Sequence, residues 1–285
     1  MSTGAPVRCG LHVSIAGSID QAVDRAREKG CDAFQIFTRN PRGWKYKKLS
    51  REEATQFQQK LEESGMGPAV AHMPYLPNLS CPKKVLHKKS VKALTMELER
   101  WDLLGIPFLV THLGGLLGKG RELGLEQLIE AIETAFGSSN SRTMLLLENT
   151  AGVKNSMGSS FEDMQEILDH VTHKSRVCVC FDTCHAFAAG YDLRNTEAVE
   201  KTVAELERTV GLDLLKGVHA NDSKGGLASR LDRHEHIGMG YIGVQGFKAI
   251  LHNETFRRLP FILETPIDSR RTDVMNLRRI RELSS

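Results

Sequence analysis

The chain has 285 residues, of which 40% are hydrophobic and 26% are charged, and its formal net charge is +3. This composition is ordinary for a globular protein, and the small basic excess does not by itself indicate a nucleic-acid partner. No run of about 18 apolar residues occurs, so we expect no transmembrane helix and no membrane partner.

Eight short apolar runs recur along the chain, and each shows little alternation between apolar and polar residues. Such runs are typical of strands that are buried on both faces, as in a parallel sheet. The predicted strands cover residues 7–13, 33–37, 68–72, 108–112, 144–148, 177–182, 215–219 and 260–264.

Helical patterns with start and stop signals lie between these strands. Ser18 with Gln21 fits a capping box at the start of the first helix. Ser50 with Glu53 repeats this arrangement, and Gly65 fits the end of that second helix. The remaining predicted helices cover residues 83–104, 123–136, 160–171, 196–210, 244–252 and 272–283.

Strands and helices thus alternate through eight units. This order predicts an α/β fold in which a parallel sheet closes into a (β/α)8 TIM barrel, and one domain spans residues 1–285. An open, doubly wound sheet is the structural alternative.

Most of the predicted strands end in a histidine, an aspartate or a glutamate. A barrel brings the carboxyl ends of its strands to one rim, where its active sites are found, so these side chains should meet. Asp232 and His234 lie in the long loop after the seventh strand and join the same set. The strand-end residues are His12, His72, His112, Glu148, Asp182 with His185 just beyond, His219 and Glu264.

One histidine at a strand end is usually a structural residue, but seven of the eight predicted strands end in His, Asp or Glu. Burying such groups without partners is costly, so the joint pattern favours a metal site. The alternative is a hydrogen-bonded polar rim without metal. The nine predicted ligands, which leave out His12, are His72, His112, Glu148, Asp182, His185, His219, Asp232, His234 and Glu264.

Imidazole and carboxylate ligands without cysteine suit a catalytic zinc or manganese site rather than a structural zinc site. Since one zinc takes about four or five ligands, nine ligands indicate two or three metals with a bridging carboxylate. Four carboxylates against three divalent ions leave a charge of about +2, which attracts a phosphodiester. Zinc also lowers the pKa of bound water to about 7 and so supplies hydroxide.

A basic loop with aromatic residues follows the second predicted strand. Residues 39–48 carry five basic side chains, with Trp44 and Tyr46 between them. A solvated loop is the simpler interpretation, but on the active rim we favour DNA contact by Arg39, Arg42, Trp44 and Lys45. For a second basic cluster, at residues 83, 84, 88 and 89, a solvated helix face is at least as good an interpretation.

Four segments resemble one family, the zinc-dependent apurinic/apyrimidinic endonucleases called endonuclease IV. They are LENTAG at 147–152, FDTCHAFAAGYD at 181–192, HANDSK at 219–224 and DRHEHIG at 232–238. The resemblance runs from residue 10 to residue 266. It implies hydrolysis of the phosphodiester 5′ to an abasic site in duplex DNA, in base excision repair, with a 3′-hydroxyl and a 5′-deoxyribose phosphate as products.

The resemblance also implies three Zn²⁺ ions per chain, with Mn²⁺ as an alternative at one or more positions. His72, His112 and Glu148 would hold the first ion, and Glu148 would bridge to a second held by Asp182, His219 and Glu264. His185, Asp232 and His234 would hold the third. Glu148 would touch two metals, so we expect its loss to damage catalysis most.

By the same resemblance, Arg42 and Tyr75 would probe the duplex at the lesion, and loops after strands two, three and seven would contact DNA. Two positions depart from the common family pattern: Leu113 follows His112 where many members have proline, and Met239 stands where many have glutamate. Both lie in loops and remove no predicted ligand.

Two other functions fit part of the pattern. A sugar isomerase or epimerase of the xylose-isomerase type would share the barrel and its metal-binding carboxylates, but needs neither the third metal group nor the basic loop. A non-catalytic binder of damaged DNA would not need all nine ligand positions filled.

Residues 1–10 lack the apolar core of a signal peptide. The six cysteines form no Cys-x-x-Cys pair, and four lie in or beside the strand-like runs, so we expect buried, reduced thiols. We therefore expect an intracellular, cytoplasmic protein. The sequence leaves the oligomeric state open, and a monomer is the default expectation.

Overall fold

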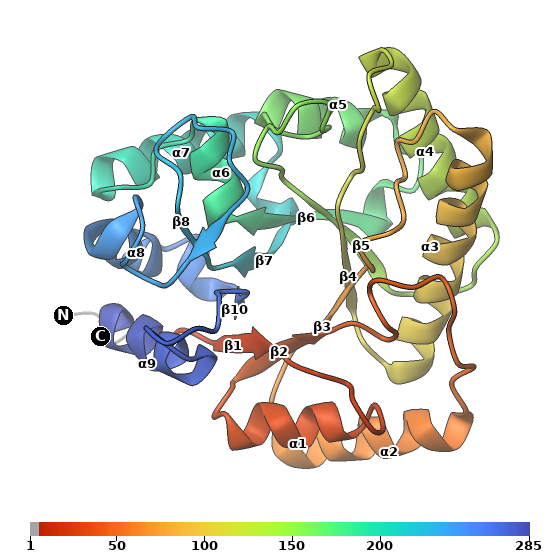
Figure 1. The fold of residues 1–285 in the computed structure, drawn as a ribbon, viewed down its shortest axis with the longest axis horizontal. Coiled ribbons are helices and arrows are strands. Elements are labelled where there is room, and N and C mark those ends of the chain that lie inside the picture. Colours follow the sequence, from red (N-terminus) through yellow and green to blue (C-terminus); the bar gives the residue numbers. More distant parts are fainter. Residues whose placement is uncertain (1–5) are drawn as a thin grey trace.

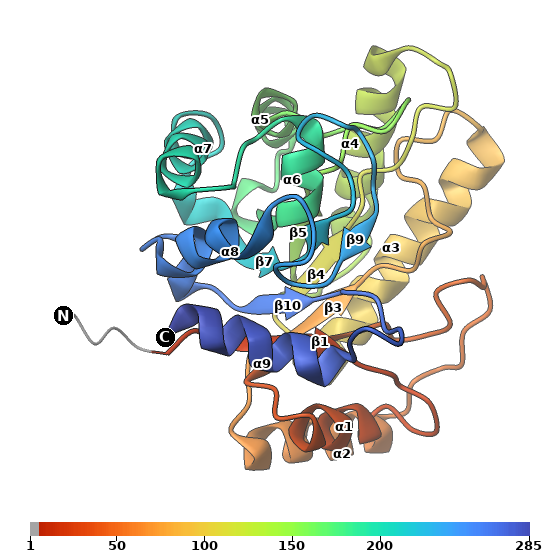
Figure 2. The ribbon, with the colours of Figure 1, turned by 60° about the vertical axis from the view of Figure 1, so that its left-hand side comes forward.

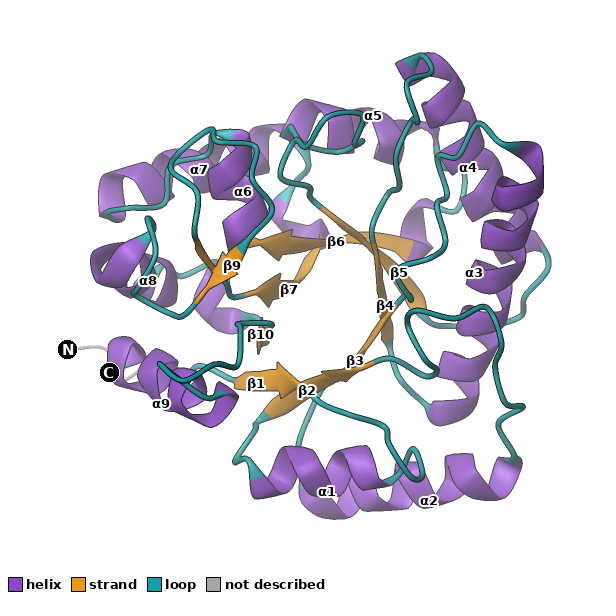
Figure 3. Cartoon of the chain, in the orientation of Figure 1, coloured by secondary structure: helices purple, strands orange, loops and turns teal. Residues whose placement is uncertain are grey.

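The computed structural model describes residues 6–285 of the chain. Eight parallel strands close into a barrel with helices around it, so the fold is the predicted (β/α)8 TIM barrel rather than an open sheet (Figures 1 and 3). The barrel strands are β1 (Cys9–His12), β2 (Ala33–Ile36), β3 (Ala69–His72), β4 (Phe108–Thr111), β5 (Met144–Glu148), β6 (Val177–Asp182), β7 (Leu215–His219) and β10 (Phe261–Leu263).

The ring follows chain order, and β10 closes it by pairing with β1. A two-stranded antiparallel hairpin, β8 (Asp222–Ser223) with β9 (His234–Glu235), stands outside the ring. The helices are α1 (Gln21–Glu28), α2 (Arg51–Ser64), α3 (Lys84–Leu104), α4 (Arg121–Gly137), α5 (Phe161–His170), α6 (Thr183–Ala189), α7 (Thr196–Thr209), α8 (Gly243–His252) and α9 (Asp273–Ser284). Short 3-10 turns cover Lys174–Arg176, Leu212–Leu214 and Phe256–Arg258.

The barrel strands are buried on both faces, which explains why their sequences do not alternate. One face packs against the helices, as where Phe34 of β2 meets Phe57 of α2 at 6.3 Å between ring centroids. On the opposite face, a small apolar cluster contains Val70, Leu146 and Cys180. Residues two positions apart on a strand share a face, so His72, Glu148 and Asp182 continue this cluster toward the carboxyl rim.

The cysteines behave as predicted. All six are buried and unpaired. Burial raises the pKa of Cys180 to about 11, so its thiol stays protonated. In the described part of the chain, no helix is long and apolar enough to span a membrane.

One of the two predicted capping boxes forms. Ser50 accepts a hydrogen bond from the Glu53 backbone, the Glu53 carboxylate accepts one from the Ser50 backbone, and Gly65 ends α2 at φ 66°. The box predicted from Ser18 and Gln21 is wrong. Asp20 is the N-cap of α1 and makes no side-chain cap bond, since its carboxylate pairs with Lys60 at 2.7 Å. The Gln21 amide oxygen accepts from Arg25 rather than from the Ser18 backbone.

Neither α6 nor the hairpin was predicted. α6 has seven residues and follows β6 without a break, and its first six residues are all buried, so it shows no amphipathic face. Each hairpin strand has two residues. Both elements lie at the carboxyl ends of β6 and β7, beside the predicted site (Figure 2).

Candidate metal centre

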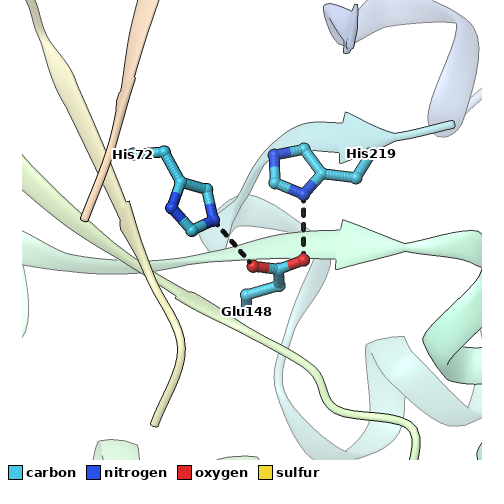
Figure 4. Close-up of side chains that lie close together, drawn as sticks. All are labelled: His72, Glu148 and His219. Carbon is cyan, nitrogen blue, oxygen red and sulfur yellow. Dashed lines mark hydrogen bonds and ion pairs between the residues drawn. The ribbon is translucent and has the colours of Figure 1, made fainter. Parts of the chain in front are cut away.

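Glu148, the last residue of β5, lies at the centre of the predicted ligand set and is 1% exposed. Its Oε2 lies 3.3 Å from Nε2 of His72 and 3.2 Å from Nε2 of His112. Its Oε1 lies 2.9 Å from Nδ1 of His219 (Figure 4). Strands β3, β5 and β7, and the residue just after β4, therefore direct one polar group each toward the same point.

A second group of four ligand atoms forms on the β6, β7 and β10 side of Glu148. One atom each from Glu148, Asp182, His219 and Glu264 lies within 4.8 Å of the others. Nδ1 of His219 faces both Oε2 of Glu264, at 3.4 Å, and Oδ2 of Asp182, at 4.0 Å. These four residues are the set expected around the second metal.

The third predicted group also comes together. His185, Asp232 and His234 offer ligand atoms within 4.8 Å of one another. Nε2 of His185 lies 3.2 Å from Oδ1 of Asp232, and Nε2 of His234 lies 3.9 Å from the same oxygen. His185 lies on α6, Asp232 in the loop between β8 and β9, and His234 on β9, so none of the three comes from a barrel strand.

Cys184 was not predicted for the site, yet its sulfur falls within 4.8 Å of ligand atoms of Asp182 and His234. The thiol is directed at the backbone oxygen of Arg233, 3.6 Å away. Burial and the Asp182 carboxylate raise the pKa of Cys184, so its thiol is neutral in this arrangement.

The position of α6 follows from a side chain of the site itself. Asp182 is the N-cap of α6, and its Oδ1 accepts a hydrogen bond from the His185 backbone at 2.7 Å. The first turn of α6 therefore starts at one ligand and carries the next one, three residues later.

The hairpin is fixed by the buried carboxylate of Asp222. It accepts hydrogen bonds from five backbone N–H groups, those of Ser223, Gly238, Gly240, Ile242 and Gly243. A Cβ atom at residue 240 would lie 2.4 Å from the Ser223 oxygen, so this close approach requires glycine. The loop 236–243, which contains Met239, is therefore held against the hairpin that carries His234.

Three of the candidate histidines each direct one ring nitrogen at a backbone carbonyl. Nδ1 of His72 donates to Met73, Nδ1 of His185 to Asn149, and Nδ1 of His234 to Glu264, at 2.6, 2.9 and 3.1 Å. In a neutral ring, a donating Nδ1 leaves a lone pair on Nε2, which faces the site. These three rings are therefore held with Nε2 toward the position of a metal.

Two buried amides, which sequence reasoning missed, support the carboxylates of the site. Gln35 of β2 donates to Oε1 of Glu264 at 2.7 Å and accepts from Nε2 of His219 at 2.9 Å. Asn221 donates to Oδ2 of Asp182 at 2.8 Å. Since a carboxylate only accepts, the Gln35 nitrogen must face Glu264, and His219 must carry its proton on Nε2.

Charge within the cluster is dense. Burial opposes ionisation of Glu148, but His112 and His219 hold its pKa well below the usual value. Burial favours neutral His185, yet the Asp182 and Asp232 carboxylates raise its pKa to about 10. The carboxylates thus draw positive charge into the pocket, which divalent cations can supply.

Two observations indicate that the residues of this pocket fit divalent cations. The donor set is imidazole nitrogen and carboxylate oxygen, which suits zinc and manganese. In addition, Nε2 of His234 is buried without a hydrogen-bond partner among the described residues. A bound metal would satisfy that nitrogen.

His12, left out of the nine, lies at the edge of the site. Its Nδ1 is 3.0 Å from the Gln35 amide nitrogen and 3.7 Å from Oε1 of Glu264. It therefore extends the hydrogen-bond network behind the ligands.

Some of the residues predicted to contact DNA are exposed, and others are partly or fully buried. Arg42 and Lys45 are exposed on the loop after β2, and Tyr75 is 61% exposed after β3. Trp44 is partly buried against the core, and the Lys89 ammonium lies 5.9 Å from its ring.

Arg39 was predicted to contact DNA, and the structure contradicts this. Its side chain is 3% exposed and its Nε bonds Oε1 of Glu97 at 2.7 Å, while Nη1 donates to the Gly43 carbonyl. The guanidinium is therefore paired with a buried carboxylate of α3, and its bond to the Gly43 carbonyl stabilises the loop 39–48 from inside the protein.

An open cleft of about 360 Å³ adjoins the third group. His112, His185, Asp232 and the exposed Tyr75 are among the residues that line it. Leu113, one of the two departures from the family pattern, is fully buried, whereas Met239 is 46% exposed.

Known proteins resemble this chain over nearly its whole length. A family model described as "Xylose isomerase-like TIM barrel" matches residues 23–283. A protein of Methanoculleus marisnigri named "Probable endonuclease 4" is 54% identical over 279 residues, 98% of this chain and 99% of that protein. The crystal structure of endonuclease IV from Thermus thermophilus matches with 38% identity and a TM-score of 0.86, over 97% of this chain and 98% of the other.

A D-tagatose 3-epimerase-like protein matches with a TM-score of 0.70 but only 19% identity, over 97% of this chain and 98% of the other. That likeness shows the fold alone.

Proposed function

This chain belongs to the endonuclease IV family, and from that premise we propose that it hydrolyses the phosphodiester 5′ to abasic sites in duplex DNA. The products would be a 3′-hydroxyl and a 5′-deoxyribose phosphate, as in base excision repair. The enzyme is a metal-dependent AP endonuclease, a hydrolase whose substrate is DNA.

The observation that carries this proposal is the third ligand group beside the barrel ring. A xylose-isomerase-like barrel needs carboxylates and histidine only at its strand ends. Here His185, Asp232 and His234 add a further group from α6 and the hairpin. Three cations would leave an excess positive charge that suits a phosphodiester rather than a neutral sugar.

We assign three Zn²⁺ ions to these groups, with Mn²⁺ as an alternative at one or more positions. His72, His112 and Glu148 would hold the first, Glu148 with Asp182, His219 and Glu264 the second, and His185, Asp232 and His234 the third. When bound, such ions neutralise charge on the phosphodiester and activate water near neutral pH.

The chain's own residues orient this chemistry. Glu148 is placed to join two groups through its two oxygens. Carbonyls and amides outside the pocket fix the imidazoles, which keeps the ligands in place as charge develops.

On the rim, Arg42, Lys45 and Tyr75 would meet the duplex, while partly buried Trp44 stiffens the loop that carries the first two. Insertion of such side chains would help to expel the abasic nucleotide, which costs less where a base is already missing. We assign the DNA contacts to the loops after β2, β3 and β7, and propose that the enzyme acts as a monomer. Its cytoplasmic location stays a prediction.

The test uses duplex DNA with a single abasic analogue. The wild type should cut on the 5′ side and leave a 3′-hydroxyl. Glu148→Gln should retain the fold but cut more than about 1,000-fold more slowly, equivalent to about 4 kcal/mol of lost stabilisation. Glu254→Gln, at an exposed glutamate, is the matched control.

Elemental analysis should find about three metal ions per wild-type chain and fewer in Glu148→Gln. Equal cutting by Glu148→Gln and the wild type would overturn the assignment of Glu148. Ketose–aldose interconversion without DNA cutting would overturn the proposed function itself.

A further inference from the structure

A row of lysines runs along one exposed side of α3. Lys84, Lys88 and Lys92 repeat every four residues, which places them one above another on the helix, and Lys83 and Lys89 flank the row. All five side chains are exposed. We name these five residues the α3 lysine face.

The charge of this face is not balanced within the protein. Residues 84–96 contain no Asp or Glu. Throughout residues 6–285, no carboxylate lies within ion-pair distance of the five ammonium groups, whereas Lys29, Lys47 and Lys60 each have such a partner. Unpaired charge of one sign on one face indicates an anionic partner.

The start of α3 adds to this imbalance. Lys83 is the N-cap and makes no side-chain cap bond, and the first turn holds no acidic residue. By contrast, α2 starts with a capping box and has Glu52 and Glu53 in its first turn. The amino end of a helix is partially positive, so lysines there are unfavourable unless an anion lies beside them.

The α3 lysine face is continuous with the loop 39–48. Lys89 lies over the ring of Trp44, and Lys89 and Lys92 line a cavity of about 180 Å³ with Trp44 and Tyr46. Arg100, further along α3, donates to backbone carbonyls of Thr38 and Lys47. The loop and the helix therefore lie side by side, as both ribbon views show (Figures 1 and 2).

The spacing of the row suits a nucleic-acid backbone. Three lysines at 1.5 Å per residue span about 12 Å along the helix. One strand of B-form DNA carries a phosphate about every 3.4 Å of its axis, so the row covers about three to four phosphates. Beyond the row, Glu97 is buried against Arg39, and the first exposed acidic residue is Glu99.

We propose that the α3 lysine face binds the phosphate backbone of the duplex that flanks the lesion, as a contact independent of base sequence. This rests on the proposed function, because that function makes duplex DNA the substrate. The face extends the DNA interface from the loop 39–48 down the side of the barrel.

The test is a triple variant, Lys84→Gln with Lys88→Gln and Lys92→Gln, in the metal-loaded enzyme. Binding to a duplex of about 30 base pairs, undamaged or with one abasic analogue, is measured by anisotropy over a salt series. The slope of log K against log salt should become shallower by about two to three, since each phosphate contact contributes about 0.9. Binding at low salt should weaken by about 10-fold or more, while kcat at saturating substrate stays unchanged.

The matched control changes net charge equally but elsewhere: Lys174→Gln, Lys201→Gln and Lys248→Gln together. A salt slope equal to that of the wild type, or a change no larger than the control's, overturns the proposal. Failure of the wild type to cut abasic DNA would instead overturn the proposed function, and the slope on undamaged duplex would still decide the role of this face.

Discussion

Replacing Gln35 by leucine keeps the volume of a buried side chain but removes two hydrogen bonds behind the second ligand group. Gln35 is fully buried, and its amide joins Glu264 at 2.7 Å and His219 at 2.9 Å. In the variant, Nε2 of His219 faces an apolar side chain. The imidazole must then either keep an unsatisfied N–H or move its proton to Nδ1, the nitrogen that faces Glu148.

Both outcomes weaken metal binding. A buried N–H left without an acceptor costs about 1–3 kcal/mol, and His219 is 1% exposed, so water cannot replace the amide. Moving the proton to Nδ1 removes the lone pair needed for a metal. Loss of such an outer partner typically lowers metal affinity about 10–100-fold, or about 1.4–2.7 kcal/mol, which agrees with the first figure.

The measurement is zinc content across a series of buffered free-zinc concentrations, with thermal unfolding of each sample. Gln35→Leu should lose one ion per chain at a free zinc level that fills the wild type. Gln58→Leu, which removes an exposed amide bonded to the Leu103 carbonyl on α3, should not. Occupancy curves that coincide for Gln35→Leu and the wild type would refute the role given to this amide.

Arg39→Met should lower the free energy of unfolding by about 3–5 kcal/mol in urea titrations, because the buried carboxylate of Glu97 loses its ion-pair partner. A loss below about 1 kcal/mol would mean that Arg39 is not needed to stabilise the Glu97 carboxylate. Asp222→Asn should destabilise by about 2 kcal/mol, since one acceptor oxygen is lost among five backbone donors. It should also release the zinc assigned to His234 before the others, and simultaneous release would contradict the link between Asp222 and that group.

The barrel could be predicted because each strand carries its own signal. β5, β6 and β7 have the predicted bounds, since burial on both faces makes them continuous apolar runs that end in a charged or imidazole side chain. The hairpin could not be predicted in this way. Its register depends on Asp222, which bonds residues up to 21 positions away, and two-residue strands have no periodicity.

The candidate ligands were predictable by residue type and position at strand ends, but their supports were not. Gln35 is a neutral amide in the middle of a chain segment whose pattern predicts only a strand, and its partners are on β7 and just after β10. Arg39 looked like one more exposed cation, because its partner Glu97 lies 58 positions away on α3. Side-chain contacts between distant elements decide both roles, and local sequence does not encode them.

Two candidate ligand groups, one at the strand ends and one on elements outside the ring, meet at a single residue. Asp182 contacts both α6 and the hairpin. Its Oδ1 accepts from the His185 backbone and so caps α6, and its Oδ2 lies 3.8 Å from Nε2 of His234 on the hairpin. Asn221, between β7 and β8, holds that same Oδ2 at 2.8 Å. Asp182 thus starts α6 and faces the hairpin through His234, so the second and third candidate groups meet at this carboxylate.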